Sequence, residues 1–318
     1  MKKKVLYIQA IHAAGMDMLR EKYDVVCPEN EDKAFLLEAV KDASAIVTRL
    51  TVIDKDLIAA GEKLEAIAKN GVGVDNIDVE AASARKIAVL TTGPANSLSV
   101  AEHTIFAMGA MLKKISYFDR AMHEGNWKCR DGGGFYDAEG RTIGIAGLGR
   151  IGRHVAEIAS VLKMRVVVYD PFLTEEQVRA AGYEYAATFE ELLAAADVLT
   201  LHMPGTKENE KIINRETLAL MKPGALLINF ARGVLVDEDA LYEALTTGKL
   251  AGAALDAFTP EPPNFAHPLY QLDNVLLSPH TGGISEDARR RMSINVAKGI
   301  DAVLEGREPE FCVNKEFL

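Results

Sequence analysis

The sequence is poor in several residue classes, and each shortage argues against a class of protein. Its 318 residues include three cysteines, Cys27, Cys129 and Cys312, which are odd in number and lack a C-x-x-C spacing. Such cysteines suit a reducing compartment, so we expect a cytoplasmic protein. No stretch approaches the ~18 apolar residues of a membrane span. The apolar run Val5–Ile8 behind three lysines is too short for a signal peptide.

Basic residues are also in short supply. The 36 Lys and Arg residues against 46 Asp and Glu residues give a net charge of −10. Nucleic acids and anionic membranes bind basic surfaces, so we expect neither as a main partner. The seven histidines show no ligand spacing such as H-E-x-x-H, so we expect no metal and no metal hydrolase. The 48% hydrophobic and 26% charged residues are ordinary for a globular protein, and the length suggests about two domains.

The most informative stretch is residues 142–152, Thr-Ile-Gly-Ile-Ala-Gly-Leu-Gly-Arg-Ile-Gly. A β-type run leads into Gly147, Gly149 and Gly152, a helical pattern follows, and a second β-branched run ends at Asp170. This order is typical of a dinucleotide site, with the phosphates at the helix N-terminus. Asp170 is placed to accept both ribose hydroxyls and would repel a 2′-phosphate, so we predict NAD rather than NADP. The alternative is an ordinary strand–helix turn.

Apolar strand-like runs alternate with helical patterns on both sides of this stretch, which predicts α/β architecture with doubly wound parallel sheets. The expected strands of the first part are Val5–Ile8, Val25–Cys27, Ala45–Thr48, Ala66–Ala68 and Ala88–Leu90, with helices Ala13–Glu21, Lys33–Lys41, Lys55–Ala60 and Val79–Arg85 between them. Later strands are expected at Val166–Tyr169, Val198–Leu201, Ala225–Asn229, Ala251–Leu255 and Val275–Leu277. A last helix is expected at Ser285–Leu304, where Arg289-Arg290-Arg291 should form a solvated face.

The middle of the chain contains a domain crossing and a Gly-rich segment. Residues 91–96 have loop composition, and a long helix is expected to begin at Ser99, with Glu102 completing a capping box, and to continue to about His123. Residues 124–140 interrupt the alternation, either as an arm that packs on a partner subunit or as a surface lid. We expect residues 1–98 plus 288–318 to form one domain and residues 99–287 to form the other.

Polar residues follow several expected strands, and ligands bind at the carboxyl ends of strands in open α/β sheets. The loop Lys69–Asp78 contains Gly71-Val72-Gly73, whose amides could bind an anion, although a simple loop explains the glycines equally well. Further along, Arg232 offers a planar fork that matches a carboxylate. Glu261 lies among prolines, and His280 follows Pro279; a His with a carboxylate partner is a common general acid/base. Taken singly, these three are explained as well by a surface ion pair, a solvated acid and a buried imidazole.

Together these motifs resemble the D-2-hydroxyacid dehydrogenase family, particularly its phosphoglycerate dehydrogenase-like members. The resemblance covers nearly the whole chain. It rests on Asn70–Asp78, Ser99-Val100-Ala101-Glu102, Gly147–Gly152, Asn229–Gly233 with Val236-Asp237-Glu238, Ala253–Asp256, Glu261-Pro262-Pro263 and Ser278-Pro279-His280.

The resemblance implies a flavodoxin-like substrate domain and a Rossmann NAD domain with a cleft between them, and a homodimer joined through the NAD domain. Arg232 would bind the substrate carboxylate, His280 would protonate the 2-oxo oxygen as hydride arrives, and Glu261 would hold His280. The implied cofactor contacts are Gly147, Gly149, Arg150, Ile151, Gly152, Asp170, His202, Pro204, Phe230, Ala231, Arg232, Asp256, His280 and Gly283. The implied substrate contacts are Arg49, Lys69, Gly71, Val72, Gly73 and Arg232.

Some features depart from the family pattern or leave the substrate open. Asn209 replaces a common threonine, and His280-Thr281-Gly282-Gly283 differs from the usual small-residue run of long phosphoglycerate enzymes. The chain ends soon after its last expected helix, so we do not expect the regulatory extension of some relatives. Arg49 and Lys69 match positions near the phosphate in phosphoglycerate enzymes, which favours 3-phosphoglycerate/phosphohydroxypyruvate. As plain surface charges they would leave hydroxypyruvate or glyoxylate reduction as the alternative.

Two other functions share parts of this pattern. One is a non-enzymatic NAD-sensing module, since a transcriptional corepressor uses the same fold; the presence of Arg232, Glu261 and His280 together argues against it. The other is formate dehydrogenase, whose members carry Gln where Glu261 stands here.

Overall fold

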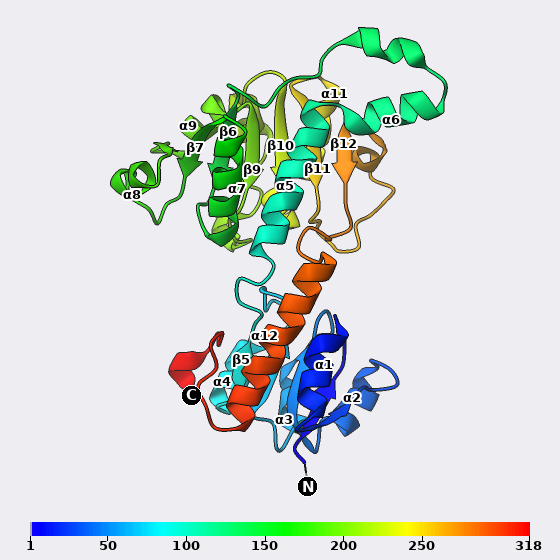
Figure 1. Cartoon of the computed structure of the whole chain (residues 1–318), viewed down its shortest axis with the longest axis vertical. Coiled ribbons are helices and arrows are strands. Elements are labelled where there is room, and N and C mark those ends of the chain that lie inside the picture. The colour runs from blue at the N-terminus through cyan, green and yellow to red at the C-terminus, as the bar shows by residue number, and fades with distance from the viewer. Residues whose placement is uncertain (1) are drawn as a thin grey trace. The chain divides into compact units, whose positions relative to one another are not determined.

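The computed structural model describes residues 2–318, which form two compact units. Unit 1 comprises the chain up to Asn96 together with Ile284–Leu318, and unit 2 comprises Ser97–Gly283. Each unit has its own parallel sheet with helices on both faces (Figure 1). The α/β class and the two doubly wound sheets predicted from the sequence are therefore confirmed. Among the helices of residues 2–318, none has both the length and the apolar character needed to cross a membrane.

The sheet of unit 1 has five parallel strands in the flavodoxin-like order β2-β1-β3-β4-β5. The strands are β1 (Lys4–Tyr7), β2 (Asp24–Val26), β3 (Ala43–Thr48), β4 (Ala66–Lys69) and β5 (Ala88–Leu90). The helices are α1 (Ala13–Arg20), α2 (Lys33–Ala39), α3 (Lys55–Ala60), α4 (Val79–Ala84) and α12 (Glu286–Leu304), with a final 3₁₀ turn η5 (Lys315–Phe317). The core residues divide α2, α3 and α4 onto one face of the sheet and α1 and α12 onto the other.

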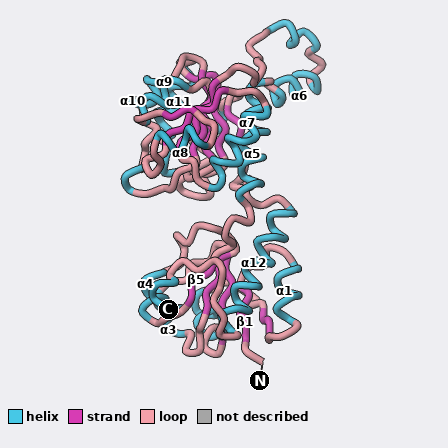
Figure 2. Tube along the Cα trace, turned by 60° about the vertical axis from the view of Figure 1, so that its left-hand side comes forward, coloured by secondary structure: helices cyan, strands magenta, loops and turns pink. Residues whose placement is uncertain are grey.

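Helix α12 carries the C-terminal part of the chain back onto unit 1. Ser285 caps its N-terminus by accepting a hydrogen bond from the Ala288 amide, and an apolar stripe that includes Val296 and Ile300 packs on the sheet. The helix runs beside α1 (Figure 2). After it, the amide of Val313 donates to the carbonyl of Val89, so the terminal segment is tied to β5. The expectation that Arg289-Arg290-Arg291 is a solvated face is wrong for Arg289, because its Nε is buried by the surrounding protein.

The sheet of unit 2 has seven parallel strands in the order β12-β11-β10-β9-β6-β7-β8. The strands are β6 (Thr142–Ala146), β7 (Arg165–Tyr169), β8 (Glu184–Tyr185), β9 (Val198–Leu201), β10 (Ala225–Asn229), β11 (Leu250–Leu255) and β12 (Val275–Leu277). The helices are α5 (Ser97–Leu112), α6 (Ile115–His123), α7 (Arg150–Val161), α8 (Glu175–Ala180), α9 (Phe189–Ala195), α10 (Arg215–Leu220) and α11 (Glu238–Thr246), with 3₁₀ turns η1 (Trp127–Gly132), η2 (Lys207–Asn209), η3 (Gly233–Leu235) and η4 (Pro268–Gln271). The strand order reverses between β6 and β9, which is the topological switch point where ligands bind in such sheets.

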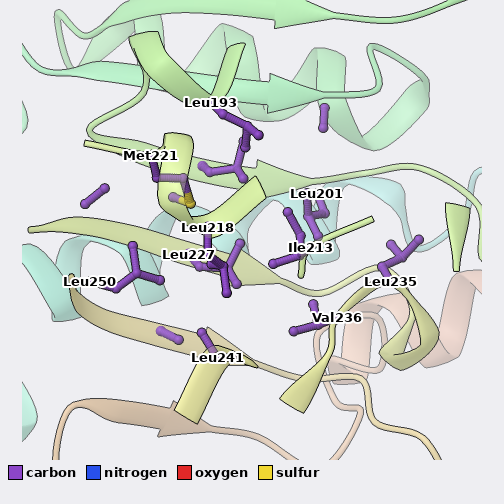
Figure 3. Packing of buried hydrophobic residues seen from close by; sticks show 14 of the residues in the cluster. Leu193, Leu201, Ile213, Leu218, Met221, Leu227, Leu235, Val236, Leu241 and Leu250 are labelled. Carbon is purple, nitrogen blue, oxygen red and sulfur yellow. The ribbon is translucent and has the colours of Figure 1, made fainter. Parts of the chain in front are cut away.

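Two hydrophobic layers hold this sheet between its helices. On one face, α9, α10 and α11 contribute Leu193, Leu218 and Leu241, which pack around Leu227 of β10 (Figure 3). On the other face, α5, α7 and α8 pack against the same strands. Because both faces are covered, the strands are buried almost throughout, which explains their continuous apolar runs in the sequence.

The part of the chain from α5 to the start of β6 differs most from the structure expected from the sequence. The long helix begins at Ser97 rather than Ser99, so Ser99 lies inside its first turn and not at its N-cap, and it breaks at Lys114, whose φ of 51° is left-handed. Helix α6 and η1 then extend away from the sheet of unit 2 (Figure 1). The two-residue strand β8 was not predicted, because it is too short to leave a periodic pattern.

Candidate active site

The glycine turn at the switch point follows β6 and opens helix α7. Gly147 has a φ of 98°, and a Cβ on Gly152 would lie 2.1 Å from the carbonyl oxygen of Gly147, so side chains are excluded at both positions. A Cβ on Gly149 would meet no atom within 4 Å, which leaves open space in front of the helix. The N-cap residue of α7 is Gly149, which has no side chain with which to cap the helix N-terminus. The turn therefore presents unblocked amides and the positive end of the helix dipole.

Asp170 closes this turn from the end of β7. Its Oδ2 accepts a hydrogen bond from the amide of Leu148 at 2.8 Å, and its Oδ1 accepts one from the amide of Phe172 at 2.9 Å. Each carboxylate oxygen has a second lone pair, so the residue can still accept hydrogen bonds from a ligand hydroxyl. The sequence prediction placed the acid at this position, and the structure adds that its orientation is fixed by two amides.

His280 and Glu261 form a pair on neighbouring loops. The Nδ1 of His280 lies 2.8 Å from both carboxylate oxygens of Glu261, and the amide of Phe258 donates to Glu261 Oε1 at 3.1 Å. His280 has a left-handed φ of 53°, and its side chain is 52% exposed. No residue of the described chain hydrogen-bonds its Nε2. The imidazole is therefore oriented by a carboxylate at one nitrogen and open to a ligand at the other.

Buried Asp256 holds the loop that carries His280. Its Oδ1 accepts hydrogen bonds from the Ser278 hydroxyl at 2.6 Å and the Thr281 amide at 2.8 Å, and its Oδ2 accepts one from the Gly282 amide at 2.8 Å. The Nε2 of His103 on α5 lies 3.2 Å from the Ser278 hydroxyl and extends this network. No motif indicated His103, because only the fold brings α5 next to the loop after β12.

Arg232 lies in the turn after β10. The amide side chain of buried Asn229 donates to the Arg232 carbonyl at 2.8 Å and accepts from the Ala231 amide at 3.2 Å, and these two hydrogen bonds brace the turn. A Cβ on Gly233 would lie 2.0 Å from the carbonyl carbon of Phe258. Phe258 is also the residue whose amide holds Glu261. The Arg232 turn and the Glu261–His280 pair are thus packed together through one segment of backbone.

His202 ends strand β9 beside the glycine turn. A Cβ on Gly147 would lie 2.8 Å from the His202 carbonyl oxygen, so the two backbones touch. The His202 side chain keeps some accessible surface, yet burial by the protein around the ring lowers its pKa to about 3. Its Nε2 lies 3.0 Å from the hydroxyl of buried Thr200. The imidazole is therefore neutral at physiological pH.

The remaining predicted cofactor residues lie on the same carboxyl edge of the unit 2 sheet. Phe230 is buried, with its ring centroid 4.9 Å from that of His103. Arg150 is exposed at the start of α7, Ile151 is partly buried against the core, and Pro204, Ala231 and Gly283 follow or flank strand-end residues.

Unit 1 carries the predicted substrate residues at the ends of β3 and β4. No residue of the described part of the chain accepts a hydrogen bond from the amides of Gly71, Val72 or Gly73. The ammonium of Lys69, in contrast, donates to the carbonyl of Arg49 and to Asn76 Oδ1. Burial, and then the charge of Arg289, lower the pKa of Arg49. The ammonium of Lys69 is thus occupied by hydrogen bonds within its own loop, whereas the guanidinium of Arg49 could still bind a ligand.

Residues 105–282 match the family profile described as D-isomer specific 2-hydroxyacid dehydrogenase, NAD binding domain. The chain belongs to this family. It is 41% identical over 312 residues to a D-3-phosphoglycerate dehydrogenase of Methanocaldococcus jannaschii, and this alignment covers 98% of the chain and 59% of the relative. It is 39% identical to a glyoxylate reductase of Pyrococcus furiosus, and this alignment covers 100% of the chain and 97% of the relative. The chain therefore spans about three fifths of the length of the phosphoglycerate dehydrogenases that it matches.

Two solved structures show the same fold as the chain. The chain superposes on the TT0316 protein of Thermus thermophilus with a TM-score of 0.88 at 37% identity, covering 98% of this chain and 99% of that one. It superposes on an NADPH-dependent glyoxylate/hydroxypyruvate reductase of Sinorhizobium meliloti, solved with NADP and malonate, with a TM-score of 0.85 at 30% identity and coverage of 98% and 97%.

The glycine turn between β6 and α7 has a local geometry that suits a dinucleotide. The open space at Gly149 and the uncapped amides of α7 suit a pyrophosphate, and Asp170 lies one strand away to accept ribose hydroxyls. Within residues 2–318, no group of three or more His, Cys, Asp or Glu side chains is arranged to hold a metal ion.

Proposed function

We propose that the protein is an NAD-dependent dehydrogenase that transfers a hydride between nicotinamide and a D-2-hydroxy acid/2-oxo acid pair. The observation that carries this proposal is the His280–Glu261 pair packed, through Phe258, against the Arg232 turn at the carboxyl edge of the nucleotide-binding sheet. Among substrates we favour 3-phosphoglycerate/phosphohydroxypyruvate, and hydroxypyruvate or glyoxylate is the alternative. Relatives of both kinds support this pair of candidates.

The residue roles follow from the chemistry of each group. Arg232 binds the substrate carboxylate through its planar fork and draws electron density from the 2-oxo group. His280 gives a proton from Nε2 to the 2-oxo oxygen during reduction and removes the hydroxyl proton in the reverse direction. Glu261 fixes the ring orientation and compensates its positive charge. The bound nicotinamide supplies or accepts the hydride.

Gly71, Val72 and Gly73 of unit 1 would donate their amides to the substrate carboxylate, which makes unit 1 the substrate-binding domain. This role is supported by the lack of any other partner for these three amides within residues 2–318.

NAD is favoured over NADP because Asp170 would repel a 2′-phosphate. His202, Pro204, Phe230, Ala231, Asp256 and Gly283, with the glycine turn, would complete the cofactor site. The imidazole of His202 is neutral, so it adds no positive charge that would attract the 2′-phosphate of NADP.

We assign a homodimer and a cytoplasmic location on two further observations. Helix α6 and the following segment extend from unit 2 with large apolar side chains in solvent, including Ile115, Met122 and Trp127, which are 55%, 50% and 63% exposed. An apolar arm of this kind suits a partner subunit. The three cysteines are free thiols, which suits a reducing compartment. Sedimentation equilibrium of wild type and Trp127→Ala tests the dimer, which the substitution should weaken.

The activity is tested by NADH oxidation against phosphohydroxypyruvate, hydroxypyruvate, glyoxylate, pyruvate and phenylpyruvate, with NADPH in parallel. The proposal expects turnover with NADH and a preference for phosphohydroxypyruvate. Preference for an unphosphorylated acid would establish the alternative. Absence of turnover with every acid would return the protein to the class of NAD-binding modules.

A further inference from the structure

The loop that carries His280 is bent around one buried carboxylate. His280 has a left-handed φ of 53°, a conformation that is strained for residues with a Cβ. Asp256, which is 2% exposed, accepts hydrogen bonds from the Thr281 and Gly282 amides after His280 and from the Ser278 hydroxyl before it. The strained turn therefore persists because donors on both sides of His280 converge on Asp256.

The hydrogen bond between His103 and Ser278 can run in only one direction. A serine hydroxyl has one proton, and its 2.6 Å distance from Asp256 Oδ1 is typical of a hydroxyl that donates to a carboxylate. The Nε2 of His103, 3.2 Å from the same hydroxyl oxygen, must therefore carry a proton and donate it. In a chain of this kind each hydrogen bond polarises the next and strengthens it.

His103 is held on a firmly packed part of unit 2. Ala101 and Ile105 of the same helix, α5, are buried in the core. The imidazole ring packs on buried Phe230, with the two ring centroids 4.9 Å apart. His103 therefore offers the His280 loop a hydrogen-bond donor from an element that is anchored independently of that loop.

The strand that leads into the His280 loop gives it little support. Strand β12 has three residues and lies at the edge of the unit 2 sheet, so it pairs with a neighbour on one side only. Unit 2 begins at Ser97 and ends at Gly283, so the loop is also the last segment of the unit. The hydrogen bond from His103 attaches this end of unit 2 to the helix that begins it.

We propose that His103 is a positioning residue of the active site. Its Nε2 proton holds Ser278 against Asp256, and these two groups fix the backbone on both sides of His280, so that His280 Nε2 points in one direction. In this role His103 acts through Ser278 and Asp256 and transfers no proton to the substrate. The inference rests on the proposed function, because it concerns the proton transfer assigned to His280.

The first test compares three substitutions in assays with NADH and the 2-oxo acid that the wild type reduces fastest. His103→Leu removes the donor and should lower kcat by about 10- to 100-fold, because a misplaced general acid slows proton transfer. His103→Gln keeps an N–H at about the reach of Nε2 and should restore kcat to within about threefold of the wild type. Thr104→Val is the matched control, because the Thr104 hydroxyl donates to the Val100 carbonyl within α5, and it should leave kcat unchanged.

Three readouts separate a positioning role from a loss of stability. In His103→Leu, the KM for the 2-oxo acid should stay within about twofold, because Arg232 is braced by Asn229 and not by this network. The primary isotope effect on kcat with deuterated NADH should increase, because the chemical step becomes slower relative to product release. In a Ser278→Ala background, His103→Leu should lower kcat no further, because the group through which His103 acts is already gone.

Three outcomes of this test overturn the proposal. They are an unchanged kcat in His103→Leu, an equal fall in His103→Gln, and a full additional fall in the Ser278→Ala background.

A second test needs no turnover. Amide hydrogen exchange followed by NMR should be about tenfold faster at Thr281 and Gly282 in His103→Leu than in wild type or His103→Gln, because the common acceptor of these amides is held less firmly. The Leu148 amide, which donates to Asp170 at 2.8 Å, is the reference and should exchange equally in all three proteins. Equal exchange at Thr281 and Gly282 in wild type and His103→Leu overturns the link whatever the enzyme reduces. A wild type that turns over no 2-oxo acid but shows this exchange pattern would contradict the proposed function and still support the link.

Discussion

His202 should make the stability of unit 2 depend on pH, at pH values above those at which the carboxylates titrate. In the unfolded chain a histidine has a pKa of about 6.5, whereas burial lowers the folded-state pKa of His202 to about 3. Between these values the unfolded chain binds a proton that the folded protein does not bind. The free energy of unfolding therefore falls as the pH decreases from 6.5 towards 3.

The size of this effect follows from the two pKa values. Between pH 7.5 and 5.0, one such group lowers the free energy of unfolding by about 2 kcal/mol. Carboxylates such as Asp197 and Asp237, whose pKa values are lowered from 3.8, lose their contribution only at more acidic pH. Groups whose pKa is raised, such as the hydroxyl of Tyr270, titrate in the alkaline range.

The assay is urea unfolding followed by circular dichroism at the two pH values, for wild type and His202→Asn. The variant should lose about 2 kcal/mol less than wild type on acidification, whatever its absolute stability. His123→Asn is the control, because this side chain is 82% exposed, and it should behave as wild type. Parallel losses for wild type and His202→Asn would refute the reasoning, because they would mean that His202 titrates alike in both states.

Three further substitutions test the site itself. Glu261→Gln should lower kcat by about 10²- to 10⁴-fold in steady-state assays while NADH still binds, because His280 loses its charged partner; an unchanged kcat would exclude that role. Asp170→Ala should raise the KM for NADH about tenfold or more and narrow its advantage over NADPH, since two charged hydrogen bonds to ribose are lost; an unchanged cofactor ratio would remove Asp170 from the cofactor site. Asp256→Asn sets an amide against backbone N–H groups and should cost about 1–3 kcal/mol, measured as a lower Tm together with slower turnover; a wild-type Tm would show that the loop has other support.

Local patterns in the sequence predicted most of the fold, because each strand buried on both faces leaves a continuous apolar run. The strand ends differ from expectation by at most two residues, as at Ala43 of β3, which is the usual uncertainty of element boundaries. The break at Lys114 was not predictable, because a lysine carries no preference for a left-handed φ and the apolar pattern continues on both sides.

The site was predictable where chemistry and motif coincide, and not where it depends on tertiary contacts. The pairing of Glu261 with His280 and the position of Asp170 follow from residues whose types already suggest their partners. The hydrogen bonds of the Lys69 ammonium depend on Asn76, and the partial burial of Arg49 depends on neighbours from other elements of unit 1. The positive charge that Lys69 and Arg49 share could not show which of them is free to bind a ligand.

Hydride transfer to C2 of a 2-oxo acid is the central claim, and isotope transfer tests it most directly. NADH carrying deuterium at the transferable position is incubated with phosphohydroxypyruvate and the protein, and the product is examined by mass spectrometry and chiral chromatography. We predict deuterium on C2 of the D-isomer of the hydroxy acid, and no product with His280→Ala. Unlabelled product, the L-isomer, or labelled product at the wild-type rate from His280→Ala would contradict it.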